Sequence, residues 1–242
     1  MNVLSAVLSL AALLQPSPRR IYTAQLADGS ASSAEQQQIV DKHNDLRRGV
    51  TPPASNMLKM EWNTIAAENA KNWAKQCTLS HSPRMKRVVK GIVCGENLFM
   101  STVATPWPAV IQSWYNEEKY FKHGVGPVPQ DAETGHYTQI VWYKSYQVGC
   151  YGTYCPSAGF SYYYVCHYCP VGNIHDLLKT PYKAGPSCGS CPSACDNGLC
   201  TNPCRYEDKD PDCNHLATES GCASLRVKQT CPASCLCTTE IK

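Results

Sequence analysis

The chain has 242 residues, of which 43% are hydrophobic and 17% charged, a composition typical of a folded protein rather than a disordered one. Its formal net charge of +3 is too small to indicate a nucleic-acid-binding surface, so we expect no nucleic-acid partner. The 16 cysteines argue against a reducing compartment, and their even number allows all of them to pair.

The N-terminal segment has the pattern of a secretory signal peptide. An uncharged apolar run extends from Val3 to Leu14, and it is shorter than the ~20 residues that span a bilayer. We assign residues 1–20 to the signal peptide and place cleavage between residues 17 and 29. The alternative is a buried helix. No other apolar run could serve as an anchor, so we expect a secreted, extracellular protein that is not membrane-anchored.

Three helices are predicted in the first half of the mature chain. Ser33-Ala34-Glu35-Gln36 resembles a capping box, and it begins a helical pattern that should end near Gly49, ahead of two prolines. A second helix is predicted from Thr64 to Cys77. A third begins at Trp107-Pro108, because proline suits the first helical position.

Three strands are predicted after the helices, over residues 135–142, 147–154 and 161–168. The first is rich in β-branched and aromatic residues, which favour a half-buried sheet. Helices followed by strands predict an α+β fold, with the helices packed against an antiparallel sheet. In Tyr162-Tyr163-Tyr164, alternate side chains should pack inward, which would leave the others for a partner.

Two histidines and two carboxylates from four separate segments could share a site. Such a set can bind a divalent cation of the zinc type or act as a general acid/base pair, and each residue could also have a separate structural role. No Gly-x-Ser-x-Gly elbow and no His-Glu-x-x-His helix is present. We therefore assign no catalytic residue, expect no enzyme, and keep a metal-dependent hydrolase as a minor alternative. The four residues are His81, Glu96, Glu117 and His136.

The composition changes at Cys188 to cysteine, proline, glycine and short polar segments. Residues 177–187 are predicted to be a linker, and ten of the cysteines follow it. A segment this short needs disulfides to fold, because it cannot bury a sufficient core. From Cys188 to the end there are five Lys or Arg and seven Asp or Glu, for a net charge of −2.

A run of basic residues lies between His81 and Glu96. It is expected to be solvated, and the sharper alternative is contact with anionic glycans or lipid headgroups. Its members are Arg84, Lys86, Arg87 and Lys90.

Several motifs resemble one known family. Residues 135–142 and 163–173 resemble the two signatures of the CAP superfamily, and residues 43–47 and 94–97 resemble its further motifs. Residues 188–200 resemble the hinge of vertebrate cysteine-rich secretory proteins, and the last six cysteines resemble the module of sea-anemone potassium-channel toxins known as ShK. The resemblance covers roughly Ser33 to Cys237.

This resemblance implies a domain plan and a site. It implies an α-β-α sandwich CAP domain over residues 33–176, a disulfide hinge over 188–200 and a small ShK-like disulfide-rich domain over 204–237. It implies that His81 and His136 bind zinc or another divalent cation that folding does not require. Glu96 and Glu117 would then orient the ligands or bound water without contacting the cation.

It also implies a function and a partner. Relatives suggest regulation of calcium, potassium, ryanodine or cyclic-nucleotide-gated channels by the C-terminal domain, so the partner would be the extracellular surface of an ion channel or another cell-surface protein. The alternative is a reproductive or innate-immune adhesion protein. The acidic tail favours a regulatory contact over a lysine that plugs a cation pore.

The family pattern further implies eight disulfides. They are Cys77–Cys155, Cys94–Cys169, Cys150–Cys166, Cys188–Cys195, Cys191–Cys200, Cys204–Cys237, Cys213–Cys231 and Cys222–Cys235.

Overall fold

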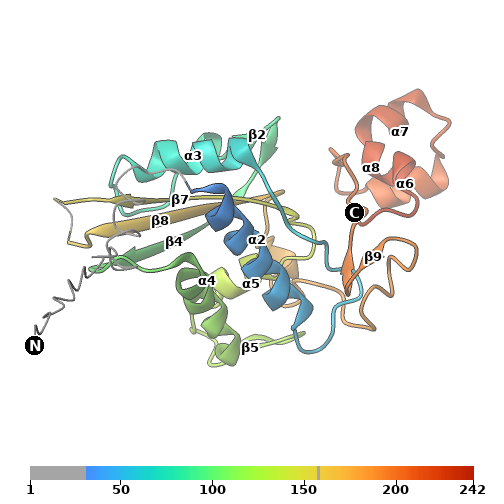
Figure 1. Cartoon of the computed structure of the whole chain (residues 1–242). Helices are drawn as coiled ribbons and strands as arrows, with labels where there is room; N and C mark the ends of the chain where they lie inside the picture. Colours follow the sequence, from blue (N-terminus) through green and yellow to red (C-terminus); the bar gives the residue numbers. More distant parts are fainter. Residues whose placement is uncertain (1–30, 157–158) are drawn as a thin grey trace, which may run out of the picture.

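A four-stranded sheet in the order β1-β7-β8-β4 forms the centre of a computed structural model that describes residues 31–156 and 159–242 (Figure 1). The strands are β1 (Glu61–Trp62), β7 (Gln147–Tyr154), β8 (Tyr162–Cys169) and β4 (Gly95–Ser101). β1 runs parallel to β7, and the other neighbours are antiparallel. The predicted signal peptide lies outside the described residues. Within them, no helix is both long and apolar enough to cross a membrane.

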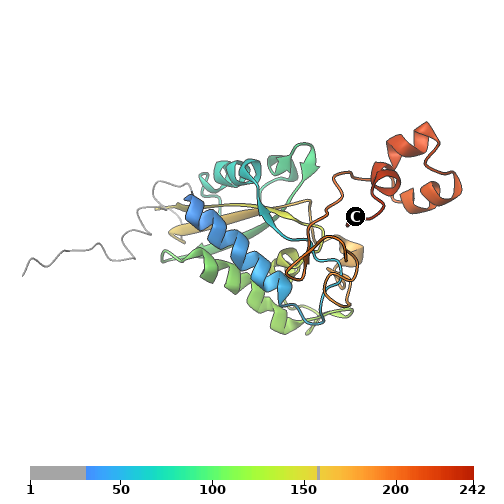
Figure 2. The same cartoon turned by 45° about the vertical axis from the view of Figure 1, so that its right-hand side comes forward.

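Helices cover both faces of this sheet, which confirms the α-β-α sandwich. α3 (Thr64–Ala74) packs on one face, where Ala70 and Ala74 join Tyr163 and Val165 in one cluster. The other face carries α2 (Ser33–Arg48), α4 (Trp107–Tyr115) and α5 (Gly135–Ile140), as Figures 1 and 2 show. Because both faces are covered, Tyr163 and Tyr164 are both fully buried. The expectation that alternate tyrosines remain free for a partner is therefore wrong for this pair.

The helix ends differ slightly from those predicted. The capping box of α2 is formed by Ser32 and Glu35, one residue earlier than expected, and the helix stops at Gly49 as predicted. α4 begins at Trp107 with proline in its first turn, also as predicted. α3 ends at Ala74 rather than Cys77, because Cys77 has a φ of 52°, outside the right-handed helical region.

The strand predicted over residues 135–142 is instead the helix α5. The Oε2 atom of Glu117 accepts hydrogen bonds from the backbone N–H groups of His136 and Tyr137, at 2.9 and 3.1 Å. These donors belong to the first turn, so the carboxylate satisfies groups that a helix start otherwise leaves unpaired. Local β-propensity loses to this tertiary contact, and Tyr137 through Ile140 are buried between α4 and the sheet.

β4 was not predicted, and several short elements complete the large domain. Two hairpins and three single 3₁₀ turns lie in the connections between the main helices and strands. They are η1 (Arg84–Lys86), β2 (Val88–Val89), β3 (Ile92–Val93), η2 (Asn116–Tyr120), β5 (Phe121–Lys122), β6 (Gly126–Pro127) and η3 (His175–Leu177).

All 16 cysteines are paired in disulfides, three in the large domain and five after residue 187. The eight pairs are those that the family resemblance implies. Cys150–Cys166 joins the neighbouring strands β7 and β8, whereas Cys94–Cys169 joins the start of β4 to the end of β8.

The segment predicted to be a linker is attached to the large domain. Ser55 N donates to Lys183 O at 2.8 Å, and Gly185 N donates to Pro53 O at 2.9 Å. The hinge, with β9 (Cys195–Asp196) and β10 (Leu199–Cys200), continues this contact, since Cys200 N donates to Met57 O at 2.8 Å. The expectation that a linker over residues 177–187 lets the tail from Cys188 fold apart does not hold for the hinge, because these bonds join the hinge to the large domain.

The last module consists of three short helices, α6 (Cys213–Glu219), α7 (Leu225–Thr230) and α8 (Pro232–Leu236). In both views they form a group beside the sandwich (Figures 1 and 2). Polar and apolar contacts join this end of the chain to the large domain: Lys144 Nζ lies 2.9 Å from Glu207 Oε2, Tyr143 OH donates to Lys242 O at 2.7 Å, and Ile241 packs in a cluster with Leu58.

A buried arginine on α2 connects the elements beneath the sheet. Arg47 is 1% exposed and donates five hydrogen bonds of 2.6–3.1 Å to four backbone carbonyls. Burial lowers the pKa of Arg47 to about 9, so the guanidinium still carries its charge at neutral pH. The acceptors are Leu58, Ile140, Trp142 and Tyr143.

We expect Arg47→Met to destabilise the protein by roughly 3–5 kcal/mol, because the change leaves several buried carbonyls without donors. Urea unfolding with the disulfides intact measures this loss. Arg48→Met is the matched control: Arg48 pairs with Asp45 and donates to Asn197 O at the exposed surface, so that variant should lose only about 1 kcal/mol. Equal losses in the two variants would show that the buried hydrogen bonds of Arg47 contribute no more to the free energy of unfolding than a surface ion pair does.

His43, also on α2, gives stability a dependence on pH. Its ring lies 2.7 Å from Ile39 O and 2.9 Å from Tyr168 OH, and burial lowers its pKa to about 4. Between about pH 6.5 and pH 4 the unfolded histidine binds a proton that the native one does not, so stability falls as pH falls through that window. Unfolding of parent and His43→Gln at pH 7 and pH 4 should show a loss about 3 kcal/mol larger in the parent. Parallel pH profiles would contradict this.

Candidate metal-binding cleft

Two histidine–carboxylate pairs lie at the edge strand β4. His81 Nδ1 is 2.7 Å from Glu96 Oε1, and His136 Nδ1 is 2.6 Å from Glu117 Oε1. The four predicted residues therefore form two pairs, each with one imidazole and one carboxylate. His81 follows α3, Glu96 is on β4, Glu117 is on η2, and His136 is in the first turn of α5.

The first pair is built around a buried carboxylate. The side chain of Glu96 is fully buried and accepts hydrogen bonds from Ser82 N at 2.9 Å and from Ser82 Oγ at 2.7 Å. The Arg87 guanidinium lies 3.3 Å from its Oε1 atom. Desolvation would raise the pKa of Glu96, but hydrogen bonds from His167, His81 and Ser82 outweigh it and lower the pKa to about 2. Glu96 is therefore ionised and held rigidly.

His167 belongs to this site, although the sequence analysis did not identify it. It lies opposite Glu96 on β8, its Nε2 is 2.9 Å from Glu96 Oε2, and it is fully buried. Burial lowers the pKa of His167 despite the carboxylate, so Nε2–H of a neutral ring donates to Glu96. Its Nδ1 atom has no hydrogen-bond partner among the described residues. Only strand register, which the sequence leaves open, brings these two residues together.

Local contacts hold the chain next to His81 and the ring of His136. Ser80 O, one residue before His81, accepts hydrogen bonds from Trp73 Nε1 and Tyr163 OH at 2.7 and 2.9 Å. The His136 ring lies nearly parallel to the Trp114 indole, with 6.3 Å between the centroids and 9° between the planes. The backbone on either side of β4 is therefore held in place, while the His81 side chain remains 60% exposed.

Consecutive residues of β4 hold the two pairs. Glu96 bonds His81, and the next residue, Asn97, donates from Nδ2 to the His136 carbonyl at 3.1 Å. Successive strand residues point to opposite sides, so β4 fixes both histidine-bearing segments along one short stretch of edge. A site shared by all four residues remains a prediction.

The donor set fits a divalent cation held by imidazoles. In each pair the carboxylate occupies Nδ1, and this arrangement orients the ring and leaves Nε2 for a ligand bond. His81 and His136 would supply the nitrogens, water would complete the coordination, and a bound cation would act as a Lewis acid. Glu96 and Glu117 would fix the tautomers. These residues do not form a cluster of three ligand atoms within 4.8 Å anywhere in the described chain.

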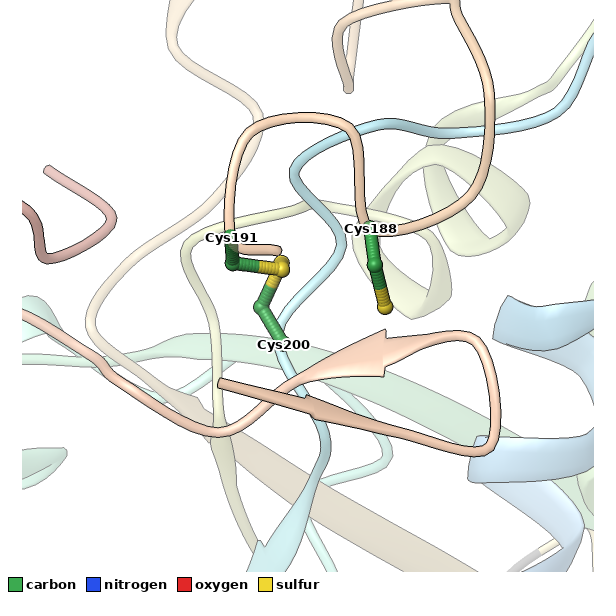
Figure 3. A group of neighbouring side chains, drawn as sticks. All are labelled: Cys188, Cys191 and Cys200. Carbon is green, nitrogen blue, oxygen red and sulfur yellow. A yellow bond between two sulfur atoms is a disulfide. The ribbon is translucent and has the colours of Figure 1, made fainter. Parts of the chain in front are cut away.

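The described residues do contain one group of three close sulfur atoms, and it is not a metal site. Cys188, Cys191 and Cys200 lie within 4.8 Å of one another at the hinge. Figure 3 shows that Cys191 and Cys200 are joined by a disulfide with Cys188 beside them. Cys188 is itself bonded to Cys195. Metal coordination by cysteine requires thiolates, so these oxidised sulfurs are not available for it.

Two family profiles match the chain. The one described as CAP, the cysteine-rich secretory protein family, matches residues 40–168, and the one described as Crisp matches residues 188–242. The first includes all four cleft residues. The second begins at the first hinge cysteine.

Several solved structures are similar to this chain. A structure described as NaASP2 with Zn²⁺ is 31% identical, with a TM-score of 0.58, and the match covers 70% of this chain and 96% of that one. BmVAL-1 is 28% identical, with a TM-score of 0.57 and coverage of 72% and 96%. A hookworm platelet inhibitor, 23% identical with a TM-score of 0.56 and coverage of 73% and 94%, shares the fold.

We expect one zinc ion to bind the parent and none to bind the His81→Ala/His136→Ala variant, because the two rings supply the nitrogens. Calorimetric titration measures both. Glu96→Gln should weaken zinc binding about 10–100-fold, since the carboxylate orients His81. The matched control is His175→Ala/His215→Ala, which removes two exposed rings. Zinc affinity unchanged in the first double variant would contradict the assignment.

Proposed function

Because this chain belongs to the CAP cysteine-rich secretory protein family and carries its C-terminal Crisp domain, we propose that it is a secreted protein that regulates ion channels through that domain. The observation that carries the proposal is a small module with its own disulfide framework beside the CAP sandwich. We further propose that the CAP domain binds a divalent cation and contributes contact area.

Secretion is supported by the oxidation state of the chain. All 16 cysteines are in disulfides, and such a protein persists in an oxidising compartment. The apolar run at residues 3–14 then supplies the export signal in this proposal.

A similar solved structure supports the proposal of zinc binding. A protein of this fold with 31% identity is described with Zn²⁺. This chain has both imidazoles, and in each the Nδ1 atom lies 2.6–2.7 Å from a carboxylate oxygen. Zinc or another divalent cation at His81 and His136 is consistent with both observations.

The Crisp module is well suited to act as a rigid binder. Disulfides Cys204–Cys237, Cys213–Cys231 and Cys222–Cys235 hold its helices, so it loses little conformational entropy on docking. α7 buries Val227 and exposes Leu225 (70%), along with two basic side chains. The net charge of −2 after residue 187 is unsuited to a plug in a cation pore, so we favour a contact that covers or regulates the channel entrance.

A hydrolase is less favoured because the serine nearest the cleft is not positioned as a nucleophile. Ser82 is 4% exposed, and its hydroxyl donates to the Glu96 carboxylate at 2.7 Å. An activated serine would instead donate to a general base and face the substrate. CAP proteins are generally binding proteins, and we propose that this chain is one as well.

We expect Leu225→Asp to abolish or strongly reduce channel modulation, because a desolvated contact at the centre of an interface does not accommodate a carboxylate. Ile65→Asp is the matched control, since Ile65 is an exposed apolar residue on α3 of the CAP domain. Recordings from a panel of calcium, potassium and cyclic-nucleotide-gated channels measure both variants. Lys228→Ala should retain most of the activity, and its loss would restore the pore-plug mechanism.

A truncated chain tests the module as a whole. The cut should follow Thr201 rather than Lys183, because residues 183–200 pair with residues 53–59 through backbone hydrogen bonds. The truncated protein should fold and bind zinc but lose modulation. Full modulation would place the function in the CAP domain. If the full chain promotes cell adhesion and has no effect on any channel, the adhesion alternative is favoured.

A further inference from the structure

The surface formed by α3 and the β2–β3 hairpin contains two hollows. The first, about 350 Å³, lies between α3 and η1 and is lined by Asn69, Asn72, Trp73, Gln76, Met85 and Lys86. The second, about 270 Å³, lies between the hairpin and the C-terminal module, with Lys90 and Arg205 in its lining. In Figure 1, β2 rises beside α3 on the side that carries the C-terminal helices. Neither lining contains an Asp or Glu.

Four cations along this surface have no acidic partner. Arg84, Lys86, Lys90 and Arg205 are exposed, and none forms an ion pair with any residue in 31–156 or 159–242. Arg87, the remaining member of the basic run, is different because it turns inward to Glu96. The expectation that the run is only solvated is therefore wrong for Arg87, whereas the other three are exposed and form no ion pair with a described residue.

The backbone holds Lys90 at the tip of the hairpin in an unusual conformation. Its φ is +48°, and the following Gly91 has a φ of +85°. The left-handed region is unfavourable for a residue with a β-carbon, and Asn or Gly is the usual choice in such a turn. A lysine there costs stability locally, and the turn places its ammonium beside the second hollow. Such strain is typical of positions with a binding role.

One face of α3 and the turn that follows it provide polar groups that suit a sugar. Asn69, Asn72, Trp73 and Gln76 are spaced at helical intervals and line the first hollow together. The Asn69 and Gln76 side chains donate to Val88 O and Asn72 O, at 2.9 and 3.0 Å, which fixes their amides. An amide oxygen can still accept from a hydroxyl, and an indole packs against an apolar ring face.

We propose that this surface binds a sulfated glycan chain. Its sulfates would lie at Lys86, Lys90 and Arg205, and its hydroxyls would lie at the α3 amides. Two hollows on either side of one hairpin fit an extended polyanion better than a single ion. Binding there would concentrate the protein at a cell surface, independently of the zinc cleft and of the channel contact on α7.

The test is titration with a sulfated heparin oligosaccharide. The variant R84Q/K86Q/K90Q/R205Q should lose affinity at least about tenfold, and higher ionic strength should weaken binding to the parent. K119Q/K122Q/K179Q/K183Q removes the same charge from other parts of the CAP domain and its junction with the hinge, and it should bind like the parent. Equal losses in the two variants would overturn the proposal, because the attraction would then depend on net charge alone.

Two further arms separate a glycan site from a general anion site. Asn72→Ala leaves the charge unchanged and should weaken oligosaccharide binding about three- to tenfold by removing hydroxyl contacts. The desulfated oligosaccharide should not bind. Phosphatidylcholine vesicles containing phosphatidylserine are the alternative probe. If the parent binds these vesicles and not the oligosaccharide, and the four-cation variant loses the vesicle binding, the proposal is overturned in favour of a lipid surface. The four-cation variant should keep its zinc site, which shows that it is folded.

Discussion

The buried guanidinium of Arg47 is the contact on which the arrangement of the large domain depends. It joins α2 to the segment before β1 through Leu58 O, and to the end of α5 through Ile140 O and Trp142 O. No carboxylate of the described residues pairs with it, so backbone carbonyl dipoles compensate the buried charge. A buried charge of this kind is stable only if every donor finds an acceptor, so it specifies one arrangement of the three segments.

That arrangement positions the histidine–carboxylate pair of α5. α5 holds His136, and the carboxylate that caps its first turn, Glu117, also orients the His136 ring. One side chain thus stabilises the helix and prepares the histidine. On the other side of β4, Glu96 combines the same two roles, since it fixes the loop at Ser82 and orients His81. Residues that define the fold locally therefore also define the geometry of the site.

The C-terminal part of the chain consists of two structurally different pieces. The hinge is an extension of the large domain, because Leu58 and Cys200 form a β-bridge and residues 183–200 pair with residues 53–59. The last module has small clusters of its own, centred on Cys204 and Cys213, and few contacts with the sandwich. Disulfides replace a hydrophobic core there, as expected for a unit of that size. The hinge therefore connects the module to a segment that is hydrogen-bonded to the CAP domain.

Much of this could be read from the sequence. The periodicity that predicts α2, α3 and α4, the cysteine count and the motifs that resemble the family depend on local pattern, and local pattern is sufficient for them. Pairwise contacts across the chain are different. The helix at residues 135–140 has the composition of a strand, and it forms because Glu117, nineteen residues from His136, caps it. His167 joins Glu96 only through the register of β8 against β4. Residues 177–187 have the composition of a linker, but Lys183 and Gly185 pair with Ser55 and Pro53. The sequence by itself predicted α2, α3, α4, β7 and β8, because each has a local periodic pattern, and its family motifs implied the disulfide pairs. Only the tertiary structure decided which carboxylate orients which histidine and where the hinge is attached, because hydrogen bonds between distant segments leave no periodic trace in either one.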